Sequence, residues 1–207
     1  MPVASKAAPA TNLPQIGEAY GGGFVSGITV DLETGKRYLN ITAGAEHELC
    51  GTWGKRGALI EGADSYIDGR ANTEAMAAAG SELAQKVLGL NIGGFSDWAI
   101  PARDQQELQY RNLKPTTDAN YCWGRDGDNP NSLPVGKLYT EESPGQTAVE
   151  AFKVGGSEAF QPRWYYSSTQ RSAHTAFFMH FGDGFQDSND KDSELHVRPV
   201  RSVLIEA

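Results

Sequence analysis

The period of the hydrophobic pattern changes along this chain, and that change limits the folds that the chain can adopt. A helical period is confined to the middle, at residues 73–88 and 103–112. Two-residue alternation marks both ends of the chain, at residues 24–30, 36–42, 163–168, 175–181 and 195–203. Segregated helices and strands predict an α+β domain with an antiparallel sheet rather than a parallel sheet of βαβ units. We expect the first and last strands to pair, so that the two ends of the domain meet.

Both predicted helices have start or stop signals. Asn72 or Thr73 caps the first helix, and Gly89 follows its last turn. Its apolar stripe at helical spacing consists of Met76, Ala79, Leu83 and Val87. Pro101 precedes the second helix, and Asp104 lies near its positive end. The pattern therefore predicts two helices between an N-terminal hairpin and the C-terminal strands.

Turns and loops take up much of the remaining sequence, in which 24 of 207 residues are glycine. Residues 31–35 predict the turn of a hairpin, and residues 182–184 (GDG) predict a second turn. Residues 114–150 have few periodic signals and predict a long loop region, which on a rigid scaffold often carries function. Residues 1–18 lack periodicity, so we expect an extended N-terminal arm, or a disordered terminus, before one domain over residues 19–207.

The chain is acidic, with a net charge of −8 and a pI of about 5.0. Its 18 lysines and arginines are scattered singly, which argues against binding of nucleic acid. No apolar run approaches the roughly 18 residues of a membrane span, and the N-terminus lacks the apolar core of a signal peptide. We therefore expect synthesis in the cytoplasm. Cys50 and Cys122 predict two buried reduced thiols, or a single bridge if the protein ends up outside a cell.

Catalytic and metal-binding motifs are missing from the sequence. It contains no Gly-x-Ser-x-Gly elbow, no phosphate-binding loop and no His-Glu-x-x-His segment, so we do not expect an enzyme. The four histidines form no evident zinc ligand set. Residues 126–131 (DGDNPN) offer oxygen ligands at alternate positions, which suit calcium, but Pro130 breaks the pattern of an EF-hand loop. The alternative is a solvated turn, as for the acidic residues 187–194, and we expect no cofactor.

Aromatic and polar side chains beside the predicted loops are the candidates for a binding surface. Tyrosine, tryptophan and arginine bury a large area with few rotatable bonds, and aromatic faces also stack on sugar rings. The candidates are Tyr121, Trp123, Arg125, Asp128, Asn129, Arg163, Trp164, Tyr165, Gln170, Arg171 and His174. The alternative is that these residues belong to the core and the scaffold.

Several short motifs occur in an order that resembles the Lcl-type C-terminal domain family of bacterial and phage proteins. The fullest is GFSDWAIP at residues 94–101, which precedes the second predicted helix. The others are YGGGFV at 20–25, WG at 53–54, DGRANT at 68–73, WYYSST at 164–169, FGDG at 181–184 and VRPVR at 197–201. The resemblance covers residues 20–203 and implies a C-type-lectin-like fold. It also implies a scaffold role for Trp98, Pro101, Leu108, Ser167, Ser168, Arg198 and Arg201.

Relatives of this fold include phage tropism determinants, adhesin tips and formylglycine-generating enzymes, so the resemblance does not decide the function. The missing catalytic motifs favour a binding module over an enzyme. We expect a component of a phage virion, at the tail fibre or baseplate, that contacts a carbohydrate or a protein on the bacterial host surface. The N-terminal arm would attach it to other virion tail proteins, and we expect a homo-oligomer, often a trimer, in which multivalency raises avidity. Two alternatives stay open: a structural virion subunit without a ligand, and an adhesin-type binding domain of a bacterium.

Overall fold

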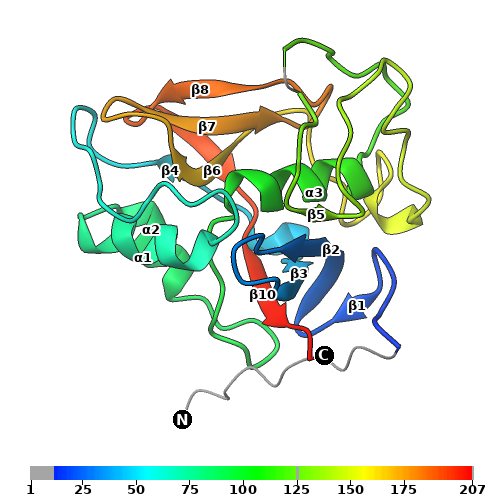
Figure 1. Ribbon diagram of the computed structural model, residues 1–207, viewed down its shortest axis with the longest axis horizontal. Coiled ribbons are helices and arrows are strands. Elements are labelled where there is room, and N and C mark those ends of the chain that lie inside the picture. Colours follow the sequence, from blue (N-terminus) through cyan, green and yellow to red (C-terminus); the bar gives the residue numbers. More distant parts are fainter. Residues whose placement is uncertain (1–11, 125, 207) are drawn as a thin grey trace.

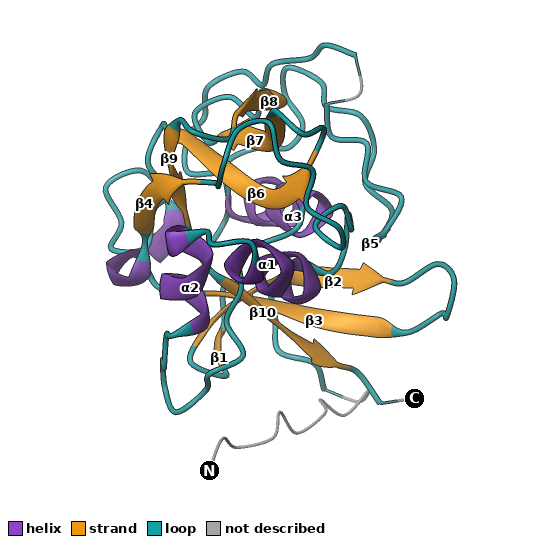
Figure 2. Ribbon diagram, turned by 90° about the vertical axis from the view of Figure 1, so that its left-hand side faces the viewer, coloured by secondary structure: helices purple, strands orange, loops and turns teal. Residues whose placement is uncertain are grey.

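The computed structural model describes residues 12–124 and 126–206, and these form an α+β fold (Figure 1). Two five-stranded sheets and three helices make up most of the regular structure in that part of the chain. The predicted α+β class is confirmed, whereas the expectation of two helices is wrong. Helix α3 (Arg103–Leu113) lies between the two sheets and contacts strands of both (Figure 2). No helix in the described residues is long and apolar enough to cross a membrane.

The first sheet combines the N-terminal hairpin with the last strand. Its strands are β1 (Ala19–Tyr20), β2 (Gly23–Val30), β3 (Arg37–Thr42), β5 (Ser132–Leu133) and β10 (Val200–Leu204). They pair antiparallel in the order β1-β2-β3-β10, and β5 adds to β2. The predicted hairpin is confirmed. The last strand pairs with the second strand of this hairpin, with Val203 opposite Leu39, so the two ends of the domain do meet in one sheet.

The second sheet comes mainly from the C-terminal part of the chain. Its strands, in order across the sheet, are β4 (Leu49–Thr52), β9 (Glu194–Val197), β6 (Trp164–Gln170), β7 (Thr175–His180) and β8 (Gln186–Asp190). The predicted turn at residues 182–184 joins β7 to β8. Strands β6 and β9 pair in parallel through Tyr165 and His196, and the other neighbouring strands run antiparallel.

Two sequence-based expectations about the C-terminal strands are wrong. Residues 195–203 are not one strand, because they divide into β9 and β10, which belong to different sheets. Pro199 lies at the division and has no N–H for a continuous ladder. The acidic residues 187–194 are not a solvated loop throughout, since those up to Asp190 pair with β7 as an edge strand. An edge strand with a solvated side tolerates such polar residues.

The helical segment that the sequence predicts as one unit is two helices. They are α1 (Gly69–Ala78) and α2 (Glu82–Leu88). The first begins earlier than predicted, because the Asp68 side chain accepts a hydrogen bond from the Ala71 N–H and caps it. Gly80 then adopts a φ of 93°, which ends the helical path, and Ser81 caps the next helix. The second predicted helix is confirmed as α3.

The predicted long loop region is confirmed, since residues 114–150 hold little regular structure apart from β5. Two short 3-10 helices, Ala45–His47 and Glu150–Phe152, complete the described elements. Residues 1–11 of the predicted arm lie outside the described residues. Residues 12–18 pack on the domain: the Gly17 N–H donates to the Val25 carbonyl at 2.8 Å, and Leu13 contacts the core. This part of the predicted arm is therefore continuous with the domain.

The predicted scaffold residues are buried, and two arginines among them carry internal ion pairs. Arg201 reaches both carboxylate oxygens of Asp97, at 2.7 and 2.9 Å. Arg198 donates to Glu48 at 2.8 Å and lies 3.9 Å from the centre of the Phe160 ring. Fully or almost fully buried with them are Trp98, Pro101, Leu108, Ser167 and Ser168. The two cysteines, Cys50 and Cys122, are unpaired as expected, but both are exposed rather than buried.

Candidate functional site

The predicted binding residues separate by exposure. Three have exposed aromatic side chains: Tyr121, Trp123 and Trp164. Four are polar and at least partly exposed: Asp128, Arg163, Arg171 and His174. Three are buried: Asn129, Tyr165 and Gln170. The remaining candidate, Arg125, lies outside the described residues.

We call the exposed residues Tyr121, Trp123 and Trp164 the aromatic face. Two of them, Trp164 and Tyr121, rest on an aromatic base that consists of the buried Phe178 and the partly buried Phe185. Trp164 stacks on Phe178, with ring centres 4.7 Å apart and planes at 12°. Phe178 is 4% exposed and contacts Phe185 edge-on at 5.9 Å. Phe185 in turn meets Tyr121 edge-on at 4.9 Å. Four rings in successive contact therefore connect Trp164 of β6 to Tyr121 of the long loop, and the two middle rings, Phe178 and Phe185, form the base.

Strand pairing explains how Trp164 and Phe178 meet. Trp164 begins β6 opposite His180 of β7, and Phe178 lies two residues before His180 on the same strand. Alternate residues of a strand share a face, so Trp164 and Phe178 form a diagonal pair within reach of two large rings. Offset stacking at this distance is the arrangement that aromatic quadrupoles favour. Trp164 keeps 44% of its surface exposed, so one ring face is held and the other is open.

The loop that carries Tyr121 and Trp123 is anchored to the turn between β7 and β8. The Tyr121 N–H donates to the Asp183 carbonyl at 2.7 Å. Further along, the Asp126 carboxylate accepts from the Trp123 N–H at 3.4 Å. Burial raises the pKa of Asp126 to about 6, and the backbone hydrogen bonds from Trp123 and Gln186 oppose this shift. Trp123 is 73% exposed, the largest fraction among the exposed large hydrophobic residues of the described chain.

The three buried candidates use their polar groups inside the scaffold. Tyr165 donates its hydroxyl to Glu48 at 2.9 Å. Gln170 accepts from the Ile60 N–H at 3.1 Å and so closes a loop on the end of β6. Asn129 donates to Glu107 at 2.7 Å and to a carbonyl of α3 at 2.9 Å. The Tyr165 hydroxyl, the Gln170 side chain and the amide nitrogen of Asn129 are buried and hydrogen-bonded, so we assign the three residues to the scaffold and not to a binding surface. The side-chain oxygen of Asn129 is buried without a hydrogen-bond partner among the described residues.

The polar candidates do not gather around the aromatic face. Arg171 and His174 lie at the turn between β6 and β7, where Arg171 donates to Ser188 at 2.9 Å. Strand β6 has 7 residues, so this turn is about 20 Å along the strand from Trp164. Arg163 precedes Trp164 and lies 3.4 Å from a ring nitrogen of His196. The structure therefore keeps Arg163 near the aromatic face and separates Arg171 and His174 from it.

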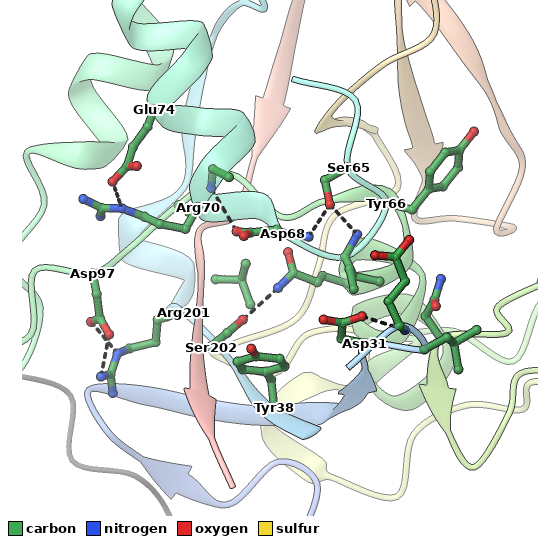
Figure 3. A pocket seen from close by; sticks show the side chains of 18 residues that line it. Asp31, Tyr38, Ser65, Tyr66, Asp68, Arg70, Glu74, Asp97, Arg201 and Ser202 are labelled. Atoms are coloured by element: carbon green, nitrogen blue, oxygen red, sulfur yellow. Dashed lines mark hydrogen bonds and ion pairs between the residues drawn. The ribbon is translucent and has the colours of Figure 1, made fainter. Parts of the chain in front are cut away.

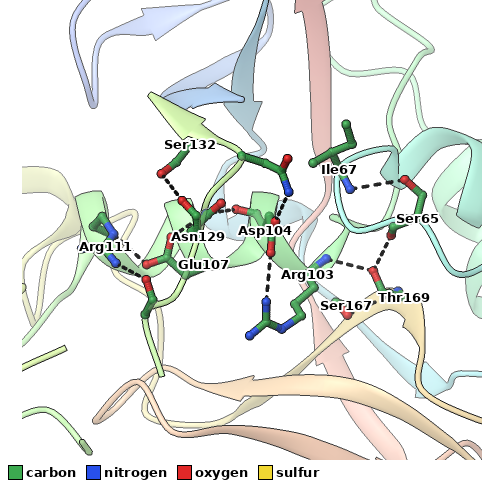
Figure 4. A network of polar contacts seen from close by, with 12 residues as sticks. Ser65, Ile67, Arg103, Asp104, Glu107, Arg111, Asn129, Ser132, Ser167 and Thr169 are labelled. Atoms are coloured by element: carbon green, nitrogen blue, oxygen red, sulfur yellow. Dashed lines mark hydrogen bonds and ion pairs between the residues drawn. The ribbon is translucent and has the colours of Figure 1, made fainter. Parts of the chain in front are cut away.

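A buried polar network holds the long loop against α3 (Figure 4). Glu107 accepts from Arg111 at 2.7 Å, from the Tyr139 hydroxyl at 2.8 Å and from Asn129 at 2.7 Å. Burial raises the pKa of Glu107, although the charge of Arg111 acts in the opposite direction. Asp104, one turn earlier, accepts from Arg103 and Asn131 in the same way. A glutamate within a helical pattern has no local signal of burial, which is why the sequence does not reveal this network.

The segment with calcium-like spacing is part of this network. Asn129 and Asn131 point amide nitrogens at the carboxylates of Glu107 and Asp104, and Asp126 accepts from the backbone of its own turn. These side chains therefore serve the loop itself. Within residues 12–124 and 126–206, no group of three or more histidine, cysteine, aspartate or glutamate side chains is arranged to hold a metal ion.

A cleft of about 790 Å³ shares no residue with the aromatic face (Figure 3). Its walls come from the turn after β2, from residues 65–71 at the start of α1, and from β10. Asp31, Tyr38, Asp68 and Ser202 line it, together with two arginines that are held in ion pairs. None of these residues was a predicted binding residue, because they come from four separate parts of the sequence and meet only in the folded chain.

Comparison with protein-family models and with curated proteins finds no match for this chain. The resemblance to the Lcl-type domain and the C-type-lectin-like fold therefore stay predictions from the sequence. The α+β class, the two sheets and the geometry of the candidate site stand on the structure alone.

Proposed function

We propose that this protein is a binding module of a phage particle, at the tail fibre or baseplate, that contacts a glycan or a protein on a bacterial surface. The motif resemblance supports the phage setting and the C-type-lectin-like fold. The aromatic face supports the binding role. The observation that carries this role is the stacking of the exposed Trp164 ring on the buried Phe178 ring at 4.7 Å.

Exposed aromatic rings are unfavourably hydrated unless a partner covers them. A ring that already packs on a rigid base loses less conformational entropy when a ligand binds. The Trp164 ring is held in place by Phe178, and Tyr121 is held by Phe185 and by its own backbone hydrogen bond to Asp183. Open aromatic faces of this kind stack on sugar rings and anchor protein interfaces. A pre-ordered aromatic surface therefore suits recognition of a glycan or a protein.

The test is binding of the purified protein to intact bacteria and to isolated envelope fractions. We expect saturable binding, reduced at least tenfold by Trp164→Ala and by Trp123→Ala. Leu59→Ala is the matched control, because Leu59 is also a largely exposed apolar residue and lies outside the aromatic face. Far-ultraviolet circular dichroism and thermal melting check that each variant is folded.

The same experiment separates this proposal from its alternatives. If a well-folded wild-type protein binds no envelope fraction, or if Leu59→Ala loses as much binding as Trp164→Ala, the aromatic face is not a receptor-binding surface. The remaining hypothesis is then a structural virion subunit. Sedimentation of the same samples measures the proposed homo-oligomer directly, with a trimer as the expected mass.

A further inference from the structure

The cleft described above has an excess of negative charge. Its carboxylates are Asp31, Glu33, Asp68, Glu74 and Asp97, and its guanidinium groups are Arg70 and Arg201. Arg70 pairs with Glu74 at 2.6 Å, and Arg201 pairs with Asp97 at 2.7 Å. Among the described residues, the other three carboxylates have no ion-pair partner within 4.0 Å, although Lys36 acts on Asp31 through space. The paired arginines thus leave three acidic residues in the lining of one cleft, of which Asp31 and Asp68 are labelled in Figure 3.

Tyr38 lines the cleft together with Asp31 and Asp68. Burial raises the pKa of Tyr38, and the charges of Asp31 and Asp68 raise it further. Tyr66 contributes a second aromatic ring to the cleft wall. A cation that enters the cleft would therefore meet carboxylates and aromatic rings together, and both attract positive charge.

The cleft borders the outer edge of β10, since Val200, Arg201 and Ser202 line it and Leu204 follows on the same strand. The Pro199 carbonyl and the Ile205 N–H bond to residues on the β3 side, whereas both backbone groups of Val200 bond to Ala99 on the other side at 2.8 Å. Alternation along an antiparallel strand then directs the N–H and C=O groups of Ser202 and Leu204 away from β3. No described residue forms a backbone hydrogen bond to these outward groups.

The β8 edge of the other sheet is protected by hydrogen bonds from its own side chains. On β8 the N–H groups of Ser188 and Asp190 are not available to pair with a further strand. They donate to the side-chain oxygens of Asp187, at 2.8 Å, and of Asn189, at 2.9 Å. Proteins commonly blunt edge strands in such ways to prevent pairing with another chain. The outer edge of β10 has no such local hydrogen bonds from its own side chains and opens into an acidic cleft.

We propose that this cleft binds an extended peptide segment rich in lysine or arginine, which adds as a strand to the outer edge of β10. The backbone of the segment pairs with Ser202 and Leu204. Alternate side chains of a strand point to the same side, so basic residues at every second position face Asp31, Glu33 and Asp68. Tyr38 and Tyr66 contact the aliphatic stems of the lysine or arginine side chains of the bound segment. A small cation would satisfy the charge but leave the strand edge unpaired, which is why we assign a peptide.

Fluorescence anisotropy with a labelled peptide of alternating lysine and valine tests this proposal on the full chain. We expect saturable binding by the wild-type protein. Glu33→Gln weakens it about two- to fivefold, because it removes one exposed charge. Glu142→Gln, an exposed acidic residue outside the cleft, leaves it unchanged. Binding also weakens as salt rises from 0.05 to 0.5 M, since salt screens exposed charges.

Two N-methylated versions of the same peptide test the strand edge without any change to the protein. One carries methyl groups on the odd residues and the other on the even residues, so the charge stays constant. Only the version that blocks the N–H groups facing β10 is expected to lose affinity, by about tenfold or more, since each lost hydrogen bond is worth roughly two- to tenfold. Absence of binding, equal loss with both methylated peptides, or equal binding by Glu33→Gln and wild type would overturn the proposal.

Discussion

Lys191 makes the stability of this protein depend on pH, because it is a buried cation that no described carboxylate pairs with. Its Nζ donates to the Ala58 carbonyl at 2.8 Å and to the Gln170 side-chain oxygen at 2.9 Å. It also lies 4.4 Å from the centre of the Trp53 ring. These contacts hold the amine in place, but burial lowers the pKa of Lys191 from 10.5 to about 8.

The sign of the effect follows from the two pKa values. Between pH 8 and 10.5 the unfolded chain keeps a proton on this lysine that the folded protein has lost, so the free energy of unfolding rises with pH. Over the range from pH 7 to 9.5, the two titration curves give a gain of about 2 kcal/mol, at about 1.36 kcal/mol for each pKa unit. Above pH 10 the buried tyrosines act in the opposite direction. Burial raises the pKa of Tyr110, Tyr165 and Tyr166, so the unfolded chain loses those protons first.

The measurement is urea unfolding followed by tryptophan fluorescence at several pH values between 7 and 9.5. We expect the free energy of unfolding of the wild type to rise by about 2 kcal/mol relative to that of Lys191→Met over this range. Lys86→Met, at an exposed lysine of α2, is the control and keeps the wild-type dependence. If the free energies of unfolding of wild type and Lys191→Met change in parallel with pH, the buried lysine is not the source of the pH dependence.

Three further predictions follow from the buried carboxylates and from one glycine. Because the folded pKa of Asp126 is raised to about 6, the free energy of unfolding falls as pH rises from 4 to 6. In the Asp126→Asn variant, urea unfolding should show a decrease between pH 4 and 6 that is smaller than that of the wild type by about 1–2 kcal/mol. An unchanged pH profile would mean that Asp126 is not the source of this decrease. Glu107→Ala leaves three donors without their acceptor and lowers the free energy of unfolding by about 3–5 kcal/mol, more than Glu107→Gln. Equal losses for the two variants would argue against the loss of the hydrogen-bond acceptor as the cause of the destabilisation. Gly184→Ala lowers the melting temperature more than Gly35→Ala: both have positive φ, but only the first places a Cβ 2.5 Å from the Tyr110 ring. Equal melting temperatures would mean that the ring moves away freely.

Part of the candidate site was predictable from residue type alone. Trp123, Trp164 and Tyr121 are large aromatic residues at the borders of a loop region, and they are exposed. Their base was not predictable, because Phe178 and Phe185 have the apolar pattern of ordinary core residues. Only strand pairing shows that Phe178 lies diagonal to Trp164. The binding hypothesis therefore depends on a contact between β6 and β7 that no local motif specifies.

The prediction of Asn129, Tyr165 and Gln170 as binding residues illustrates the same limit. Each has a side chain that is common at binding surfaces, yet each is buried and forms a hydrogen bond to a residue distant in sequence. Whether such a side chain is paired inside or free outside depends on which distant segment packs against it. Exposure of polar residues is therefore a property of the tertiary structure.

Elements with local signals could be predicted from the amino-acid sequence. The hairpin of β2 and β3, the turn at residues 182–184 and helix α3 follow from alternation, glycine turns and helical spacing over a few residues. Tertiary structure alone decided the division of residues 195–203 between two sheets, the burial of Glu107 and the assembly of the acidic cleft. The physical reason is that pairing, burial and charge compensation depend on contacts between distant segments, whereas backbone preferences act within one turn or strand.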